Sequence, residues 1–279
     1  MAESEDMLAR SRERVADATA SASERVAGAK ATATERVAAA SGRVADARVA
    51  ASERVAGAKA AAEEFIARQK PRLRGVSHEW AFFVSLGAGG ALVAAAPTPR
   101  ATLAVAIYAA SLSALLGVSA LYHRVDWQRP EIRRWMRRLD HSMIFLLIAG
   151  TMTPFAVLVL DGPWAKALLI AVWAGAAAGI VVELIWVDAP KWVTTIIYLS
   201  VGWIGALGFP GIVVSAGIGA GVLIAAGGVL YTTGAIVYAR QRPDPNPAVF
   251  GYHEIFHVLV IAAAAAHFAA VAIYALPAG

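Results

Sequence analysis

Long apolar runs follow one another along the chain from Trp80 onward, and short polar breaks separate them. Runs of about 18 or more apolar residues are typical of helices that cross a membrane. The pattern therefore predicts an all-α fold, a polytopic membrane protein with seven transmembrane helices. The predicted spans are Trp80–Ala96, Leu103–Tyr122, Leu139–Leu160, Trp164–Val187, Trp192–Phe209, Ile212–Ala239 and Tyr252–Leu276.

Residues 1–70 have a different pattern and are predicted to form a segment separate from residues 71–279. The motif ERVA, or a close variant, recurs at steps of 11, 11, 7 and 11 residues. Eleven residues make about three helical turns, so the repeated valines can share one narrow face. These valines are Val15, Val26, Val37, Val44 and Val55. The repeat predicts an Ala-rich helical or disordered segment that contacts a membrane surface or a protein partner, or is simply a solvated helix.

Charge adds the orientation and excludes one class of partner. Residues 1–70 carry 12 Lys and Arg against 11 Asp and Glu, which argues against a basic tail that binds nucleic acid. The segment from Arg72 to the first span and the breaks after the second, fourth and sixth spans lie on one side of the membrane and together hold 11 Lys and Arg. The segments on the other side hold Arg100 and Lys166. Cytoplasmic loops carry the excess of Lys and Arg. We therefore expect a multi-pass protein of the plasma membrane with a cytoplasmic N-terminus and an outside C-terminus.

Composition limits the chemistry. The chain has no cysteine, so a metal site must use His, Asp or Glu, and no disulfide or Cys nucleophile exists. The first 18 residues lack the apolar core of a cleaved signal peptide, so we expect the N-terminus to be retained.

Polar residues that are unusual in a membrane helix gather at one predicted depth. Ser119 and His123 end the second span, Asp140 begins the third, and His253 and His257 begin the seventh. All three ends are predicted to be cytoplasmic. Ionisable groups within spans are costly and usually functional.

The spacing of these residues fits a metal site. His253 and His257 are four residues apart and share one helical face, and His123 can supply a third nitrogen. Three His ligands leave a fourth position open, as in catalytic zinc sites. Asp140 could then handle a proton and Ser119 could donate a hydrogen bond to an oxyanion. The alternatives are an interfacial His pair, an Asp140 that caps its helix, and a Ser119 that only packs.

Four further polar residues lie outside this predicted site. We expect His78 to be interfacial, His141 to be structural, His267 to be buried and hydrogen-bonded or pore-facing, and Glu183 to pair with a basic group.

Three motifs give the chain a family resemblance. SALYHRVDW, LDHSMIFLLIAGTMTPF and HEIFHVLVIAAAAAHF resemble the hemolysin III proteins, which belong with the progestin and adiponectin receptor family and are related to membrane ceramidases. The resemblance covers about residues 71–279. It implies seven spans, a zinc ion held by His123, His253 and His257, nearby Ser119 and Asp140, and hydrolysis of a lipid amide such as ceramide. In the first-span motif of the family a His-Gly pair is more usual, but this chain has HEW at residues 78–80. This difference leaves the role of His78 open.

The segment HEIFH also matches the zinc-protease motif H-E-x-x-H, which suggests an alternative function. Intramembrane metalloproteases add a later Asp ligand, often in LDG, and here Leu160–Gly162 precedes the His pair. The predicted topology puts Asp161 on the opposite side of a hydrocarbon layer about 30 Å thick. We therefore predict a cytoplasm-facing zinc site of a metal-dependent hydrolase that acts on a lipid amide or ester, with membrane lipids as partners. A non-enzymatic regulator or receptor and a pore-forming cytolysin remain as alternatives.

Overall fold

The computed structural model describes residues 71–279 without a gap, residues 46–59, and the residues 19, 21, 23–26, 28, 30, 32, 35–36 and 41–43. The chain divides into two units, residues 1–68 and 69–279. In the first unit the described residues are helical, and Val26 and Val55 are exposed. Val15, Val37 and Val44 lie outside the described residues, so the shared valine face of the repeat stays a prediction.

Residues 71–279 form helices joined by short loops, and this part of the chain contains no strand beyond one isolated bridge between Asn246 and Phe250. The all-α prediction is therefore confirmed for the described residues. The helices are α2 (Val76–Ala94), α3 (Pro99–Arg124), α4 (Pro130–Pro154), η1 (Phe155–Val159), α5 (Gly162–Ile185), α6 (Lys191–Ala206), α7 (Phe209–Ala216), α8 (Ile218–Arg240), α9 (Tyr252–Ala270), η2 (Val271–Ala275) and η3 (Leu276–Ala278).

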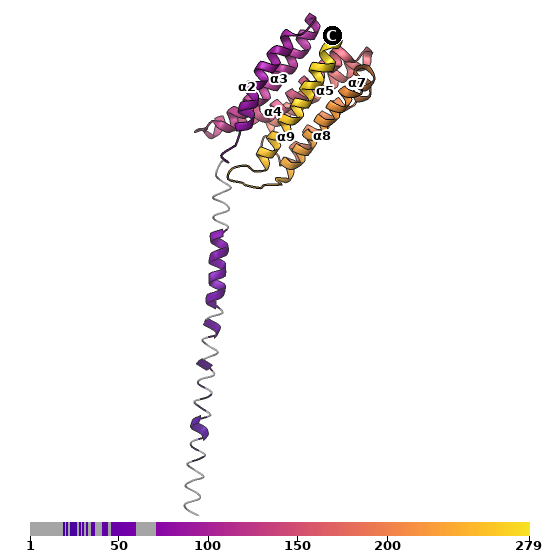
Figure 1. The fold of residues 1–279 in the computed structure, drawn as a ribbon. Helices are drawn as coiled ribbons and strands as arrows, with labels where there is room; N and C mark the ends of the chain where they lie inside the picture. Colours follow the sequence, from indigo (N-terminus) through magenta and orange to yellow (C-terminus); the bar gives the residue numbers. More distant parts are fainter. Residues whose placement is uncertain are drawn as a thin grey trace, which may run out of the picture. The chain divides into compact units, whose positions relative to one another are not determined.

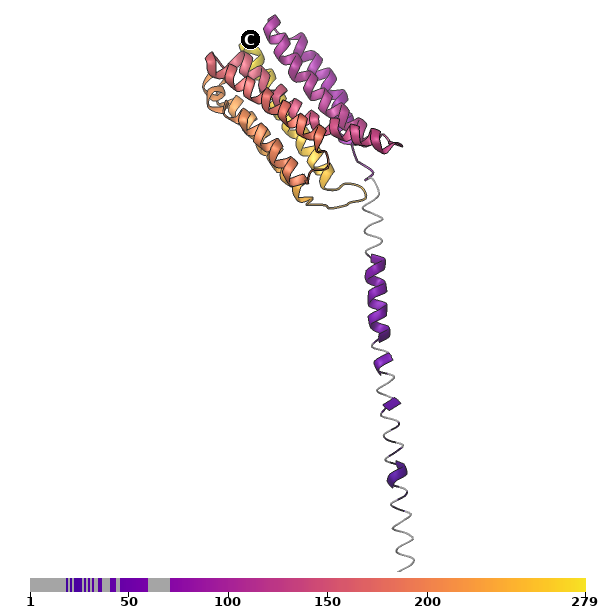
Figure 2. The ribbon, with the colours of Figure 1, turned by 180° about the vertical axis from the view of Figure 1, so that it is seen from behind.

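The long helices of this unit pack side by side in one bundle (Figures 1 and 2). Neighbours in sequence pack together, as α2 with α3, α3 with α4, and α8 with α9. The C-terminal helix α9 also contacts α2, and α4 and α6 contact each other across the sequence. The first and last long helices of the unit are therefore neighbours, which brings the start of α9 near the start of α2.

Five helical stretches are long and apolar enough to cross a membrane: α3, α4 with η1, α5, α8, and α9 with η2 and η3. The pair α6 and α7, bent by 40°, makes a sixth if it counts as one span. The seven predicted spans are thus not confirmed. The remaining helix, α2, carries the polar side chains of His78 and Glu79 in its first turn, and they lower its mean hydropathy.

Two predicted boundaries were wrong. The basic stretch before Leu139 is not a loop, because α4 begins at Pro130, and proline is well suited to the first position of a helix. The sixth span was expected to run unbroken from Ile212, but α7 ends at Ala216 and α8 begins at Ile218. Gly217 separates them with a φ of 90°, which glycine adopts without a Cβ clash.

The bundle has a core of large apolar side chains and an apolar outer surface. Tyr108, Phe145, Phe155, Leu168 and Ile212 are among the largest fully buried side chains. Exposed large apolar side chains occur on all the long helices, among them Trp80, Phe83, Leu103, Trp164, Ile185, Trp203, Val222 and Ile273. Such a surface suits contact with lipid, where apolar side chains need no cover.

Candidate metal centre

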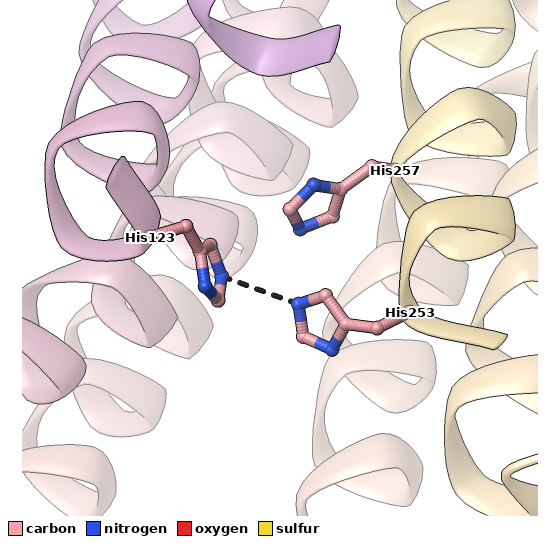
Figure 3. Close-up of side chains that lie close together, drawn as sticks. All are labelled: His123, His253 and His257. Carbon is pink, nitrogen blue, oxygen red and sulfur yellow. Dashed lines mark hydrogen bonds between the residues drawn. The ribbon is translucent and has the colours of Figure 1, made fainter. Parts of the chain in front are cut away.

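Three histidines from two helices meet at one end of the bundle (Figure 3). His123 is the last residue but one of α3, and His253 and His257 lie in the first two turns of α9. One ring nitrogen from each lies within 4.8 Å of the others. His123 and His257 are buried and His253 is half-buried. This placement is compatible with a metal site.

The distance between His123 and His253 is close to that expected for two ligands of one ion. Nε2 of His123 lies 3.2 Å from Nε2 of His253. Two nitrogens that each lie about 2.0–2.1 Å from a tetrahedral zinc ion are separated by about 3.3–3.4 Å. The ring centroid of His257 lies 5.1 Å from that of His123 and 4.6 Å from that of His253. Nε2 of His257 is the ring nitrogen that points toward His123 and His253 (Figure 3), and Nδ1 is buried with no hydrogen-bond partner among the described residues.

The two predicted companions lie beside the histidines. Asp140 of α4 places Oδ2 3.6 Å from Nε2 of His123. Ser119 lies one turn before His123 on α3, and its side chain interacts with that of Asp140. Ser119 is 3% exposed, so this contact is made away from water. The structure therefore brings all five predicted site residues to one place, from α3, α4 and α9.

His78 is closer to this centre than the sequence suggested. Its ring stacks on that of His257, with a centroid distance of 3.8 Å and an angle of 9° between the planes. His78 is 2% exposed, so the expectation of an interfacial position was wrong. Spacing could not reveal the contact, because α2 and α9 lie at opposite ends of the sequence. The sequence signal for His78 was its place in HEW, where the resemblance to the family left its role open.

A cavity of about 600 Å³ extends from the centre into the bundle. His253, His257, Asp140 and Ser119 line its polar end. The rest of its wall is mainly apolar and includes Leu147, Ile148, Phe155, Leu199, Trp203, Phe209, Ile212, Ile224 and Val260. A cavity of this size and lining suits a drug-sized or lipid-like ligand.

Three further residues singled out from the sequence, Glu183, His141 and His267, have partners within the bundle. Glu183 of α5 is 3% exposed, lies 3.1 Å from Nδ1 of His141, and accepts a hydrogen bond of 3.0 Å from Tyr198 of α6. It therefore links α4, α5 and α6. Nε2 of His267 lies 3.1 Å from the carbonyl oxygen of Ile224, which links α9 to α8.

Outside the spans, the polar end of the bundle carries an ion pair between α4 and the loop after α5. Arg137 donates a hydrogen bond to Asp188, and this bond lowers the pKa of the exposed Asp188 carboxyl.

Glu254, the acidic residue of HEIFH, is not available as a protease base. One carboxylate oxygen accepts a hydrogen bond from Arg74 at 2.5 Å, and the other accepts one from the backbone N–H of Gly251 at 2.8 Å. Asp161 follows Asp140 by 21 residues, and the helix between them, which ends at Val159, rises by about 28 Å along α4 and η1. It lies too far from the histidines to bind the same ion, so the LDG motif does not complete a protease site.

Comparison with known proteins identifies the family. The model of the family described as "Haemolysin-III related" matches residues 66–268. The chain belongs to this family. It is 33% identical over 181 residues to "Hemolysin-3" of Bacillus cereus, which covers 64% of this chain and 78% of the relative. It is 32% identical to "Hemolysin-3 homolog" of Bacillus subtilis, over 60% of this chain and 75% of the relative.

The family extends beyond bacteria. The "Monocyte to macrophage differentiation factor" of Homo sapiens is 29% identical over 169 residues, which is 59% of this chain and 67% of the relative. The resemblance to hemolysin III proteins, within the progestin and adiponectin receptor family, is therefore confirmed.

Proposed function

We propose that this haemolysin-III related protein is a zinc-dependent hydrolase of a lipid amide or ester in the plasma membrane. One observation carries the proposal: ring nitrogens of His123, His253 and His257 converge beside Asp140, at the mouth of an apolar cavity. Zinc accepts three His ligands and leaves a position open for chemistry. The cavity offers a place for the long apolar chain of a lipid substrate whose carbonyl group lies at the histidines.

The residues around the centre have complementary roles in this proposal. A zinc ion held there would polarise a carbonyl group and activate a water molecule for attack on it. Asp140 accepts a proton from the attacking water and returns it to the leaving group, since it is close to His123. Ser119 donates a hydrogen bond to the oxyanion that develops on the carbonyl. The apolar side chains that line the cavity, among them Leu147 and Ile212, hold the acyl chain and exclude water.

The topology is also proposed, with α2 as a seventh span. This helix has 19 residues, about 28 Å of rise, and packs along α3. With seven crossings the N-terminus is cytoplasmic, the C-terminus is outside, and the metal centre faces the cytoplasm. Residues 1–70 then lie where the repeat can contact the membrane surface or a protein partner.

A cytolysin is a second candidate, favoured by the name of the relative in Bacillus cereus. A pore needs polar residues along the length of a span. In residues 71–279 the charged side chains within the bundle gather instead at the end that holds the metal centre, with Asp140 and Glu183. A regulator without turnover would keep the same centre, with its fourth position closed by a protein ligand.

The zinc content of the full chain tests the proposal. We expect about one zinc per chain by mass spectrometry after purification in detergent without chelator, and loss of this zinc in His257→Ala. The matched control is His267→Ala, which changes a histidine on the same helix that bonds to Ile224. Wild-type protein without zinc would contradict the hydrolase. A zinc-loaded protein that releases no fatty acid from a panel of lipid amides and esters would favour the regulator.

A further inference from the structure

Residues 71–78, which we call the strap, lie along the loop that precedes α9. The N–H of Arg72 donates to the carbonyl oxygen of Ala248 at 3.1 Å, and the N–H of Leu73 donates to that of Val249 at 3.2 Å. The strap then enters α2 at Val76. Two backbone hydrogen bonds therefore fasten the strap to the segment that leads into the helix of His253 and His257.

An ion pair fastens the strap to α9 itself. Nε of Arg74 lies 2.5 Å from Oε1 of Glu254, and the side chains are 20% and 2% exposed. Oε2 of Glu254 accepts the N–H of Gly251 at 2.8 Å. The first N–H groups of a helix have no partner within it, and an acidic side chain at its third position satisfies one of them. Glu254 thus holds the strap and the first turn of α9 at once.

The strap also touches two of the three histidines. A Cβ on Gly75 would lie 2.6 Å from Cβ of His123, so the backbone passes directly over that residue. Gly75 has a φ of 79°, which only glycine adopts readily. Three residues further on, His78 stacks on His257 at 3.8 Å. The strap is therefore in contact with α3 and α9 where their histidines converge.

We propose that Arg74 and Glu254 are positioning residues of the metal centre. Their ion pair presses the strap onto the first turn of α9 and so fixes His253 and His257 relative to His123. This inference rests on the proposed zinc site and goes beyond it, because neither residue is a ligand. Glu254 lies about 100° around the helix from His253. A buried carboxylate without its partner is strongly destabilising to the folded protein. Glu254 therefore stays paired with Arg74 only when the first turn of α9 keeps its position.

Metal affinity tests the proposal in the full chain. We would titrate Co²⁺ into metal-free protein and follow its visible absorption, which reports the ligand geometry. Glu254→Gln should weaken Co²⁺ binding about tenfold or more, the lower end of the effect of removing residues that orient metal ligands. Arg74→Gln should do the same, whereas Arg74→Lys, which keeps the charge, should restore most of the affinity.

The chain offers a matched control in a second ion pair close to the strap. Glu79 of α2 lies 2.7 Å from Arg124 of α3, and both side chains are more than 40% exposed. Glu79→Gln removes one carboxylate from the same region but touches no part of the first turn of α9. It should leave the affinity and the spectrum of Co²⁺ unchanged. If Glu254→Gln binds Co²⁺ as tightly as wild type does, the proposal is overturned.

A second measurement separates this proposal from the proposed function. If wild type binds neither Co²⁺ nor Zn²⁺, the zinc site fails, and hydrogen exchange of the metal-free proteins decides the role of the strap. The amides of residues 252–257 should exchange several times faster in Glu254→Gln than in wild type or Glu79→Gln, because the turn has lost its fastening. Equal exchange in all three proteins would overturn the positioning role.

Discussion

The histidines of the candidate metal centre differ in how far the sequence alone predicted their contacts. His253 and His257 are one helical turn apart, so their shared face follows from the helix alone. The contact of His78 with His257 joins α2 to α9, and no regularity along the chain could reveal it. Glu254 looked like the base of a protease, but its two oxygens are bonded to Arg74 and Gly251. The type of a residue therefore indicated its chemistry, and its partners decided its role.

Asp140 gives the sharpest test at this scale. In the proposed hydrolase, Asp140→Asn should keep zinc, because the residue is not among the three ligands. It should lower the hydrolysis rate by about 10²–10⁴, since an amide cannot accept the proton. The control is Asp188→Asn. Asp188 is an exposed carboxylate in the loop after α5, and it pairs with Arg137 of α4. Zinc content and fatty-acid release are measured together, and an Asp140→Asn protein that hydrolyses at the wild-type rate refutes the role.

The helices α3 and α4, which carry His123 and Asp140, approach each other closely at Gly150. A Cβ on Gly150 of α4 would lie 1.9 Å from Oγ and 2.8 Å from Cβ of Ser111 on α3. The two helices can therefore meet here only because residue 150 has no side chain, as is common where membrane helices pack tightly. Six of the seven predicted spans contain glycine, and the sequence alone did not distinguish this one.

Alanine substitutions compare two glycines in helices. Gly150→Ala should destabilise the protein by about 1–3 kcal/mol, because the added methyl group forces α3 and α4 apart. Gly90→Ala on α2 meets no atom within 4 Å and should leave the stability unchanged or raise it by up to about 1 kcal/mol. Thermal unfolding in detergent measures both. Equal melting temperatures would show that the close approach contributes nothing to stability.

Across the whole molecule, the candidate metal centre lies where the end of α3 meets the starts of α2 and α9. α9 packs against both α8 and α2, so the starts of α2 and α9 and the end of α3 come together. The loops at this end include 125–129 and 241–251. Arg129 and Arg242 of these loops are among the arginines that suggested a cytoplasmic side, and four more, Arg133, Arg134, Arg137 and Arg138, lie in the first turns of α4. The orientation of the metal centre therefore depends on the number of crossings, and on α2 in particular.

Single cysteines test the crossings, because the chain has none of its own. With α2 as a span, Ser52→Cys and Gln128→Cys should react with an impermeant maleimide only after the cells are permeabilised. Asp161→Cys, at the other end of α4, should react in intact cells. All three positions are exposed. If Ser52→Cys instead reacts in intact cells while Gln128→Cys does not, α2 does not cross and the seven-span topology is wrong.

The sequence by itself determined the helical class, the approximate helices and the residue types at the metal centre. These follow from local physics: apolar length makes a membrane helix, and spacing of four puts His253 and His257 on one face. It did not determine that α4 starts at Pro130 or that Gly217 divides the predicted sixth span. Only the tertiary structure decided the contact of His78 with His257 and the ion pair of Arg74 with Glu254. Both join segments about 180 residues apart, and such contacts arise from packing between helices, which no local pattern encodes.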